Sequence, residues 1–220
     1  MLENTFFSTG LSKLDEMMGG GIAIGHISTI RGATGSGKTM LSSSILSSVK
    51  CPVLHFLTED KEPRFISVDK ENYTFVVVDN ADDIRIKIIN AWNNGFAGII
   101  AIDSIDRMNF DKASNPCEYS KMMNSWFLWF LSKIKECAKE SRLSENASSM
   151  LITKQIKIQD GFSGGEQILC SGSSGFAHMT SQQLDVQIKD GKISTKMSKN
   201  RFAPVSSDVC EFEFDNKGIK

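Results

Sequence analysis

Residues 32–39 constrain the fold of this chain more than any other stretch. They read Gly-Ala-Thr-Gly-Ser-Gly-Lys-Thr and fit the pattern G-x-x-x-x-G-K-[ST]. Residues 26–30 before them predict a strand, and residues 40–46 after them can run as a helix. This order is typical of a phosphate-binding P-loop, because converging backbone N–H groups and a helix N-terminus favour an anion. The alternative is a glycine-rich turn that matches the pattern by chance.

The motif also predicts the role of each of its side chains around a bound nucleotide. Lys38 is expected to reach the β- and γ-phosphates, and the Thr39 hydroxyl is expected to bind Mg²⁺. The residues expected to surround the nucleotide are Gly32, Ala33, Thr34, Gly35, Ser36, Gly37, Lys38, Thr39 and Met40.

The size and charge of the chain restrict its partners. A length of 220 residues fits one domain, 1–220, with a real hydrophobic core. The hydrophobic content of 40% and the formal charge of −1 are ordinary for a globular protein. Because no overall basic field exists, binding of nucleic acid would have to come from local patches or from several copies together.

The cysteines and the apolar runs bear on the compartment. The five cysteines form no C-x-x-C pair, which favours reduced thiols in a cytoplasmic protein. No apolar run approaches the length of a membrane span, and the N-terminus lacks the pattern of a secretion signal. We therefore expect a cytoplasmic protein with no membrane contact.

The hydrophobic pattern predicts an α/β fold with a mainly parallel central sheet, flanking helices and an antiparallel β edge at its C-terminal end. Asp190-Gly191 is a hairpin signal within that edge. Residues 107–119 are polar and predict a loop, and 160–175 are rich in glycine and serine. The predicted helices are 11–18, 81–92 and 121–137, and the predicted strands are 52–58, 75–78, 98–102, 150–153, 184–189, 192–198 and 209–214.

Two carboxylates end predicted parallel strands, so both should face the same crevice. Asp103 has the form of a Walker B acid, which would hold the Mg²⁺ shell beside Thr39. Glu59 could orient the attacking water. The alternatives are an Asp103 that only starts a turn and a Glu59 that is a solvated surface acid in an acidic cluster.

Several features along nearly the whole chain resemble the RecA superfamily of ATPases. The likeness is greatest to the cores of the bacterial recombinase RecA and the branch-migration helicase RadA, with KaiC and DnaB-type helicases more distant. The features are Ser8-Thr9-Gly10 with Leu14-Asp15 and Gly19-Gly20-Gly21, the P-loop, Thr58-Glu59, Ile102-Asp103-Ser104, and Lys199-Asn200-Arg201-Phe202, which resembles a "KNRF" motif.

The resemblance implies a role for each matching residue. Glu59 corresponds to the catalytic glutamate and Gln155 to the γ-phosphate sensor. Lys199 and Arg201 correspond to cations that contact the ATP bound by a neighbouring subunit. Two residues apart on a strand, they would share one face, although spacing alone is equally consistent with a solvated basic edge strand.

The resemblance further implies a RecA-like P-loop fold and a DNA-dependent ATPase with ATP and Mg²⁺ as its ligands. It implies a homo-oligomer, filament or ring, with ATP at the subunit interfaces, acting on single-stranded DNA in recombination or repair. Residues 107–119 and 157–174 take the places of the family's two DNA-binding loops, L1 and L2. The L2 segment begins with Lys157 but also holds Asp160 and Glu166, so it is poor in basic residues.

Two other functions fit the same motifs. One is a ring-forming helicase motor like DnaB or RadA. The other is a module like KaiC or the small recombinase paralogues, which binds ATP to organise a partner and hydrolyses little. The near-neutral charge of the chain keeps this second alternative open.

Overall fold

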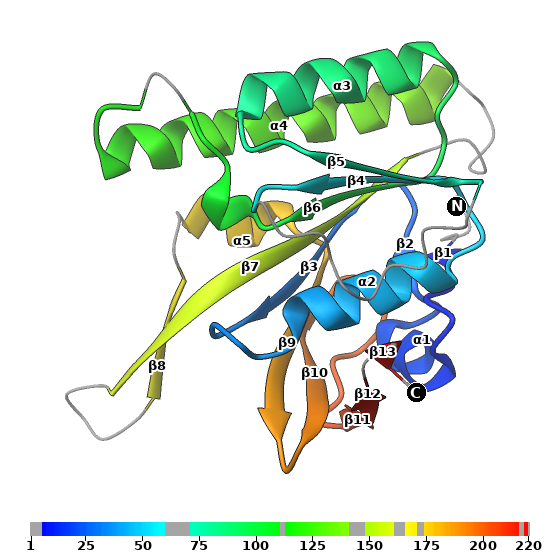
Figure 1. The fold of residues 1–220 in the computed structure, drawn as a ribbon, viewed down its shortest axis with the longest axis vertical. Coiled ribbons are helices and arrows are strands. Elements are labelled where there is room, and N and C mark those ends of the chain that lie inside the picture. Colours follow the sequence, from blue (N-terminus) through cyan, green and yellow to red (C-terminus); the bar gives the residue numbers. More distant parts are fainter. Residues whose placement is uncertain are drawn as a thin grey trace.

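A mixed sheet of nine strands forms the centre of the computed structural model (Figure 1). The structure describes residues 6–59, 71–110, 113–140, 148–160, 166–170, 174–215 and 218–219. The strand order is β11-β10-β9-β3-β7-β6-β4-β5, with β8 paired to β7. The six parallel strands are β3 (Ile27–Gly32), β4 (Val53–Leu57), β5 (Tyr73–Val77), β6 (Ile99–Asp103), β7 (Ser149–Asp160) and β9 (Gln182–Lys189).

Antiparallel pairing completes the sheet at one edge. β10 (Lys192–Asn200) pairs with β9 and with β11 (Val209–Phe212). The turn between β9 and β10 has positive φ at Asp190 (50°) and Gly191 (73°), as the hairpin signal in the sequence requires. Two short ribbons lie outside the main sheet: β1 (Phe6–Phe7) with β2 (Ile22–Ala23), and β12 (Phe214–Asp215) with β13 (Gly218–Ile219).

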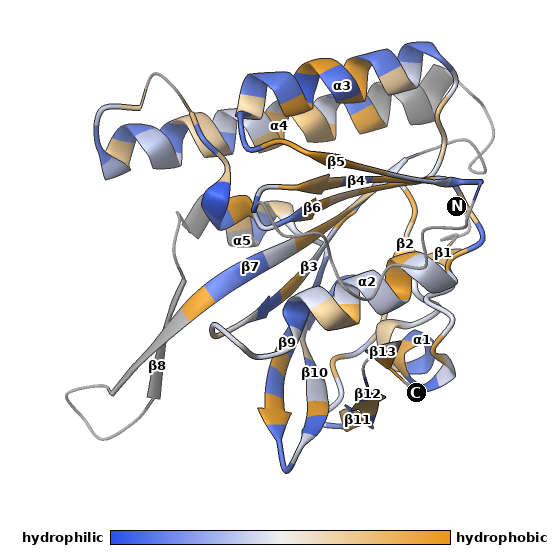
Figure 2. Cartoon of the chain, viewed as in Figure 1, coloured by the Kyte–Doolittle hydropathy of each residue, from blue (hydrophilic) through white to orange (hydrophobic). Residues whose placement is uncertain are grey.

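Helices cover both faces of the sheet (Figure 1). On one face, α3 (Ala81–Asn93), α4 (Pro116–Glu140) and α5 (Ser174–Met179) share a core with β3, β4, β6 and β7. On the other face, α1 (Ser12–Met18) and α2 (Lys38–Ser48) share a second core that reaches β9, β10 and β11. Hydrophobic colouring follows the buried strands β4 and β6, whereas α3 alternates between apolar and polar residues (Figure 2). The protein therefore has an α/β fold with a mostly parallel mixed sheet between helices.

The segment before the P-loop is fixed by a single carboxylate. Asp15 in α1 accepts the Thr9 N–H (2.7 Å), the Thr9 hydroxyl (2.6 Å) and the Ser8 hydroxyl (2.6 Å). Gly19 ends α1 in the left-handed conformation, with φ of 78°. These contacts explain locally why Ser8-Thr9 and Asp15 occur together.

The prediction of a loop over residues 107–119 is partly wrong. A short 3-10 helix, η1 (Ile105–Arg107), follows β6, and α4 begins at Pro116 rather than at 121. Asn115 Oδ1 accepts the N–H groups of Cys117 and Glu118, both at 3.0 Å. An asparagine cap followed by proline in the first turn is a helix-start signal that lies within the polar stretch.

The segment 157–174, expected from the resemblance to take the place of the loop L2, also differs from that expectation. β7 continues to Asp160, and β8 (Glu166–Cys170) pairs with it antiparallel, from Ile156 opposite Cys170 to Asp160 opposite Glu166. The segment taken for the DNA-binding loop L2 is therefore partly a β-hairpin, because short alternating runs flank its glycines. Residues 161–165 and 171–173 lie outside the described residues, as do 111–112 of the L1 segment.

The helices of the described residues also bear on membrane contact. None of them combines the length and the apolar character that crossing a bilayer requires.

Candidate functional site

The P-loop connects β3 to α2 with the geometry that its glycines predict. A Cβ at Gly32 would lie 2.3 Å from the Val186 carbonyl oxygen and 2.3 Å from Ser36 Oγ. Gly37 has φ of 87° immediately before α2 begins at Lys38. Thr34 and Gly35 are exposed, whereas Ser36 is buried and its hydroxyl has no hydrogen-bond partner. The loop therefore presents its backbone at the N-terminus of α2, where an anion is favoured.

Lys38 lies among the acidic groups of this edge of the sheet. Its Nζ donates to the carbonyl of Ala33 at 2.7 Å, so the side chain folds over the loop. Burial lowers the pKa of Lys38, and the negative charges of Asp103, Asp106 and Glu59 oppose that shift. Lys38 is therefore a cation held within electrostatic reach of three carboxylates.

Asp103 ends β6, and β7 lies between β6 and the P-loop strand β3. Its Oδ1 accepts the hydroxyl of Thr153, and its Oδ2 is inaccessible to solvent and has no hydrogen-bond partner. Burial raises the pKa of Asp103, while hydrogen bonds from the Thr153 and Thr39 side chains and the charge of Lys38 oppose the rise. An unpaired oxygen at a buried carboxylate is costly, and a cation would remove that cost.

The residues present fit a Mg²⁺ ion that also takes oxygens from a nucleotide. Thr39 and Asp103 supply a hydroxyl and a carboxylate close together, and the unpartnered Oδ2 is a free ligand position. Among the described residues, no group of three or more His, Cys, Asp or Glu side chains could hold a metal ion. Protein side chains in this part of the chain therefore provide only part of a metal shell. Met40, the third residue of α2, packs against the α1–α2 core.

Glu59 lies just beyond β4 and reaches the same edge of the sheet. Its Oε1 pairs with Arg107 Nε at 3.3 Å, and both side chains are largely exposed. The negative charge of Glu59 acts on both Lys38 and Asp103. The carboxylate is therefore within electrostatic reach of Lys38 and is paired with Arg107 of η1.

Gln155 contacts the P-loop directly. β7 pairs with β3 in register, with Gln155 opposite Gly32. The Gln155 side-chain amide donates to the Thr34 hydroxyl at 2.5 Å, and its backbone N–H donates to Asp106 Oδ2 at 2.5 Å. The residue expected to sense a phosphate thus touches the loop expected to bind one.

Lys199 and Arg201 lie apart from this group. Lys199 is in β10 opposite Gln183, whereas Arg201 follows the last residue of β10, so only one of the two is on the strand. Arg201 N–H donates to the Ser181 carbonyl (3.0 Å) and Arg201 Nη2 to the His178 carbonyl (2.5 Å). Burial lowers the pKa of Lys199, and the positive charge of Arg201 lowers it further. The two cations are therefore neighbours.

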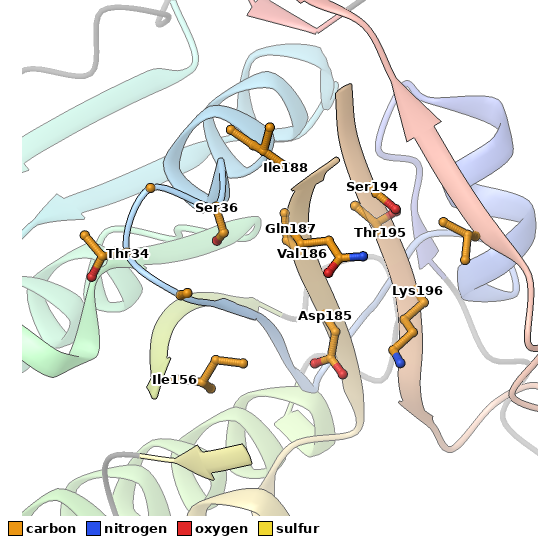
Figure 3. Close-up of a pocket in the computed structure, with 13 residues that line it drawn as sticks. Thr34, Ser36, Ile156, Asp185, Val186, Gln187, Ile188, Ser194, Thr195 and Lys196 are labelled. Atoms are coloured by element: carbon orange, nitrogen blue, oxygen red, sulfur yellow. The ribbon is translucent and has the colours of Figure 1, made fainter. Parts of the chain in front are cut away.

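A pocket of about 500 Å³ adjoins the P-loop on the side of β9 and β10. Figure 3 shows Thr34 and Ser36 of the loop at one side and Gln187, Ser194 and Lys196 on the facing strands. Ile156, Val186, Ile188 and Val209 add apolar lining. The pocket is thus continuous with the loop of residues 32–39 and has both apolar and polar walls.

Three residues of the site were not among those predicted from the sequence: Asp106, Arg107 and Thr153. The signal for Asp106 was a second carboxylate three residues after Asp103, at the spacing of a 3-10 turn. The signal for Thr153 was a polar residue within an apolar strand next to the strand of Asp103. Arg107 had no distinguishing signal in its polar segment.

A scan against protein-family models finds no family that matches this chain, and a search of curated proteins finds no match to its sequence.

Proposed function

We propose that this chain is a RecA-like, Mg²⁺-dependent ATPase that assembles head to tail and acts on single-stranded DNA in recombination or repair. The observation that carries the proposal is the convergence of Lys38, Asp103 and Gln155 on one P-loop, with Glu59 close by. Lys38 begins α2, and Asp103 and Glu59 come from the C-terminal ends of β6 and β4. Gln155 lies within β7, opposite Gly32 at the C-terminal end of β3. Ligands of open α/β sheets bind at such strand ends.

Each residue has a task in the proposed reaction, which is attack of water on the γ-phosphate of ATP. The backbone of the P-loop and the Lys38 ammonium bind and orient the phosphates. Thr39 and Asp103 would hold Mg²⁺, which supplies charge stabilisation at the phosphate oxygens. Glu59 orients the water and takes its proton. The Gln155 amide, which donates a hydrogen bond to the Thr34 hydroxyl, would exchange that contact for one with a phosphate oxygen.

The adjoining pocket supports a nucleoside substrate. Its apolar residues suit the faces of a base, and its polar residues suit a ribose. Binding of DNA rests on the family resemblance, and the β7–β8 hairpin is the segment that corresponds to L2.

One observation favours the alternative of a nucleotide-binding module with little hydrolysis. Glu59 is paired with Arg107 rather than free to act as a base. Hydrolysis would then require that pair to open, which an assembly partner or DNA could bring about.

The test is the rate of ATP hydrolysis with and without single-stranded DNA, in the wild-type chain, Lys38→Ala and the exposed control Lys50→Ala. We expect DNA-stimulated turnover that Lys38→Ala lowers by about 100-fold or more, and that Lys50→Ala leaves unchanged. Unchanged turnover in Lys38→Ala would contradict the assignment. Tight ATP binding with negligible turnover under both conditions would favour the assembly module.

A further inference from the structure

The two strands that carry Asp103 and Gln155 separate at the edge of the site. β6 pairs with β7 as far as Ile102 opposite Ile152, and the chain then turns into η1. β7 continues along β3 and reaches Gln155 opposite Gly32. Backbone groups of β7 that face β6 therefore lose their strand partner at this level, and each needs another one.

Asp106 provides that partner from η1. Its Oδ2 accepts the Gln155 backbone N–H at 2.5 Å, and a charged acceptor makes such a bond stronger than a neutral one. η1 itself is held by Tyr119 of α4, whose hydroxyl interacts with the Ile105 carbonyl (3.2 Å) and the Met108 carbonyl (3.0 Å). Ile105 is fully buried. The carboxylate thus projects from a fixed support.

A second hydrogen bond links the side chain of Gln155 to the P-loop. The side-chain amide of the same residue donates to Thr34 Oγ1 at 2.5 Å. Asp106, Gln155 and Thr34 therefore form one continuous path from η1 to the phosphate-binding loop. Beyond Gln155, β7 runs directly into its hairpin with β8.

We infer that Asp106 is a positioning residue, which fixes the main chain of Gln155 so that its amide faces the P-loop. This inference rests on the proposed function, because the group it positions is the proposed phosphate sensor. It predicts that Asp106 acts through Gln155 and has no separate effect on turnover.

A different mechanism is available to the same carboxylate, since its negative charge also acts on Lys38. Two substitutions separate the mechanisms. Asp106→Asn removes the charge but keeps an oxygen that can accept the Gln155 N–H, whereas Asp106→Ala removes both. Positioning predicts that Asn rescues the function, and action through charge predicts that it does not.

The experiment measures kcat and KM for ATP in the wild-type chain, Asp106→Asn, Asp106→Ala, Gln155→Ala and the double variant of the last two. We expect Asp106→Ala to lower kcat about tenfold with little change in KM, since it misplaces a group that acts in the transition state. Asp106→Asn should stay within about threefold of wild type, because the acceptor is retained. In the Gln155→Ala chain, Asp106→Ala should cause no further loss.

Glu71→Ala, an exposed acid before β5, is the matched control and should leave kcat unchanged. If Asp106→Ala does not fold, the same cycle is run with Asp106→Ser, whose shorter side chain cannot reach the amide. Losses that multiply in the double variant, or an Asp106→Asn chain as slow as Asp106→Ala, would overturn this inference alone. A wild-type chain without turnover would overturn the proposed function, and this inference with it.

Discussion

Lys38 and Arg201 lie at opposite ends of strand β3. Lys38 begins the helix that follows the C-terminal end of β3 at Gly32. Arg201 N–H donates to the Ser181 carbonyl, and Ser181 N–H donates to the carbonyl of Ile27, the first residue of β3. The five-residue step from Ile27 to Gly32 corresponds to about 16 Å along the strand.

One copy of the chain therefore cannot easily bring both cations to one phosphate. If Arg201 acts on ATP, the ATP belongs to another copy, whose Lys38 end meets the Arg201 end of the first. Such an interface joins two different surfaces, and its repetition gives a ring or a filament.

Replacing Asp103 should raise the stability of the fold and lower the ATPase activity. Burial raises the pKa of Asp103 and its Oδ2 has no partner, so the ionised carboxylate destabilises the nucleotide-free fold. We expect Asp103→Asn to raise the free energy of unfolding by about 1 kcal/mol, as seen when strained functional sites are relieved. The same change should lower turnover by about 100-fold and raise the Mg²⁺ concentration needed for half-maximal rate.

Thermal unfolding without nucleotide and a Mg²⁺ titration of the ATPase rate measure these two effects. Asp79→Asn, at an exposed position after β5, is the control and should change neither. Strong destabilisation by Asp103→Asn would show that the carboxylate is structural rather than a vacant ligand.

Glu59 should affect chemistry and leave both binding and stability unchanged. Its ion pair with Arg107 is exposed, at 52% and 64% of the two side chains, so the pair contributes less than about 1 kcal/mol to folding. We expect Glu59→Gln to lower turnover about 100-fold with unchanged ATP affinity, because the amide cannot accept a proton from water. Single-turnover kinetics and binding of a fluorescent ATP analogue measure the two quantities. Equal turnover in Glu59→Gln and wild type would rule out Glu59 as the general base.

The stability of the fold should fall in mild acid because of His55. This buried side chain shares a hydrogen bond of 2.6 Å with the Tyr73 hydroxyl, and burial lowers the pKa of His55 to about 4 from an ordinary 6.5. Between those two values the unfolded chain binds more protons than the folded chain. The contribution of His55 to the free energy of unfolding should therefore be constant above pH 6.5 and fall by up to about 3 kcal/mol toward pH 4.

Urea unfolding across this pH range measures the effect. His55→Gln should remove that part of the pH dependence. Tyr73→Phe keeps the imidazole, so the pH dependence should remain. Parallel curves for wild type and His55→Gln would show that other groups cause the loss.

The sequence predicted the elements that carry local signals. The strand, loop and helix around Lys38, the strand that ends at Asp103 and the turn at Asp190-Gly191 all occur where periodicity and turn residues placed them. These features depend on neighbouring residues, so a short window contains the necessary information.

The contacts between distant segments could not be predicted in this way. That β7 lies between β3 and β6 depends on sheet order, and only this order brings Thr153 to Asp103 and Gln155 to Thr34. The hairpin of β7 with β8 was missed because glycine and serine dominate the composition of that stretch. The early start of α4 was missed because Asn115 and Pro116 look like loop residues until the helix that they cap is seen.

The most direct test of the shared site mixes two inactive variants. Lys38→Ala lacks the P-loop cation, and Arg201→Ala lacks the cation proposed to act on a neighbouring copy; Arg201→Ala should still bind ATP like wild type. Lys87→Ala, an exposed lysine on α3, is the control. Equal mixing should restore about a quarter of the wild-type ATPase rate, because one head-to-tail interface in four then combines an intact Lys38 with an intact Arg201. A mixture no more active than the sum of its two components would contradict an active site shared between copies.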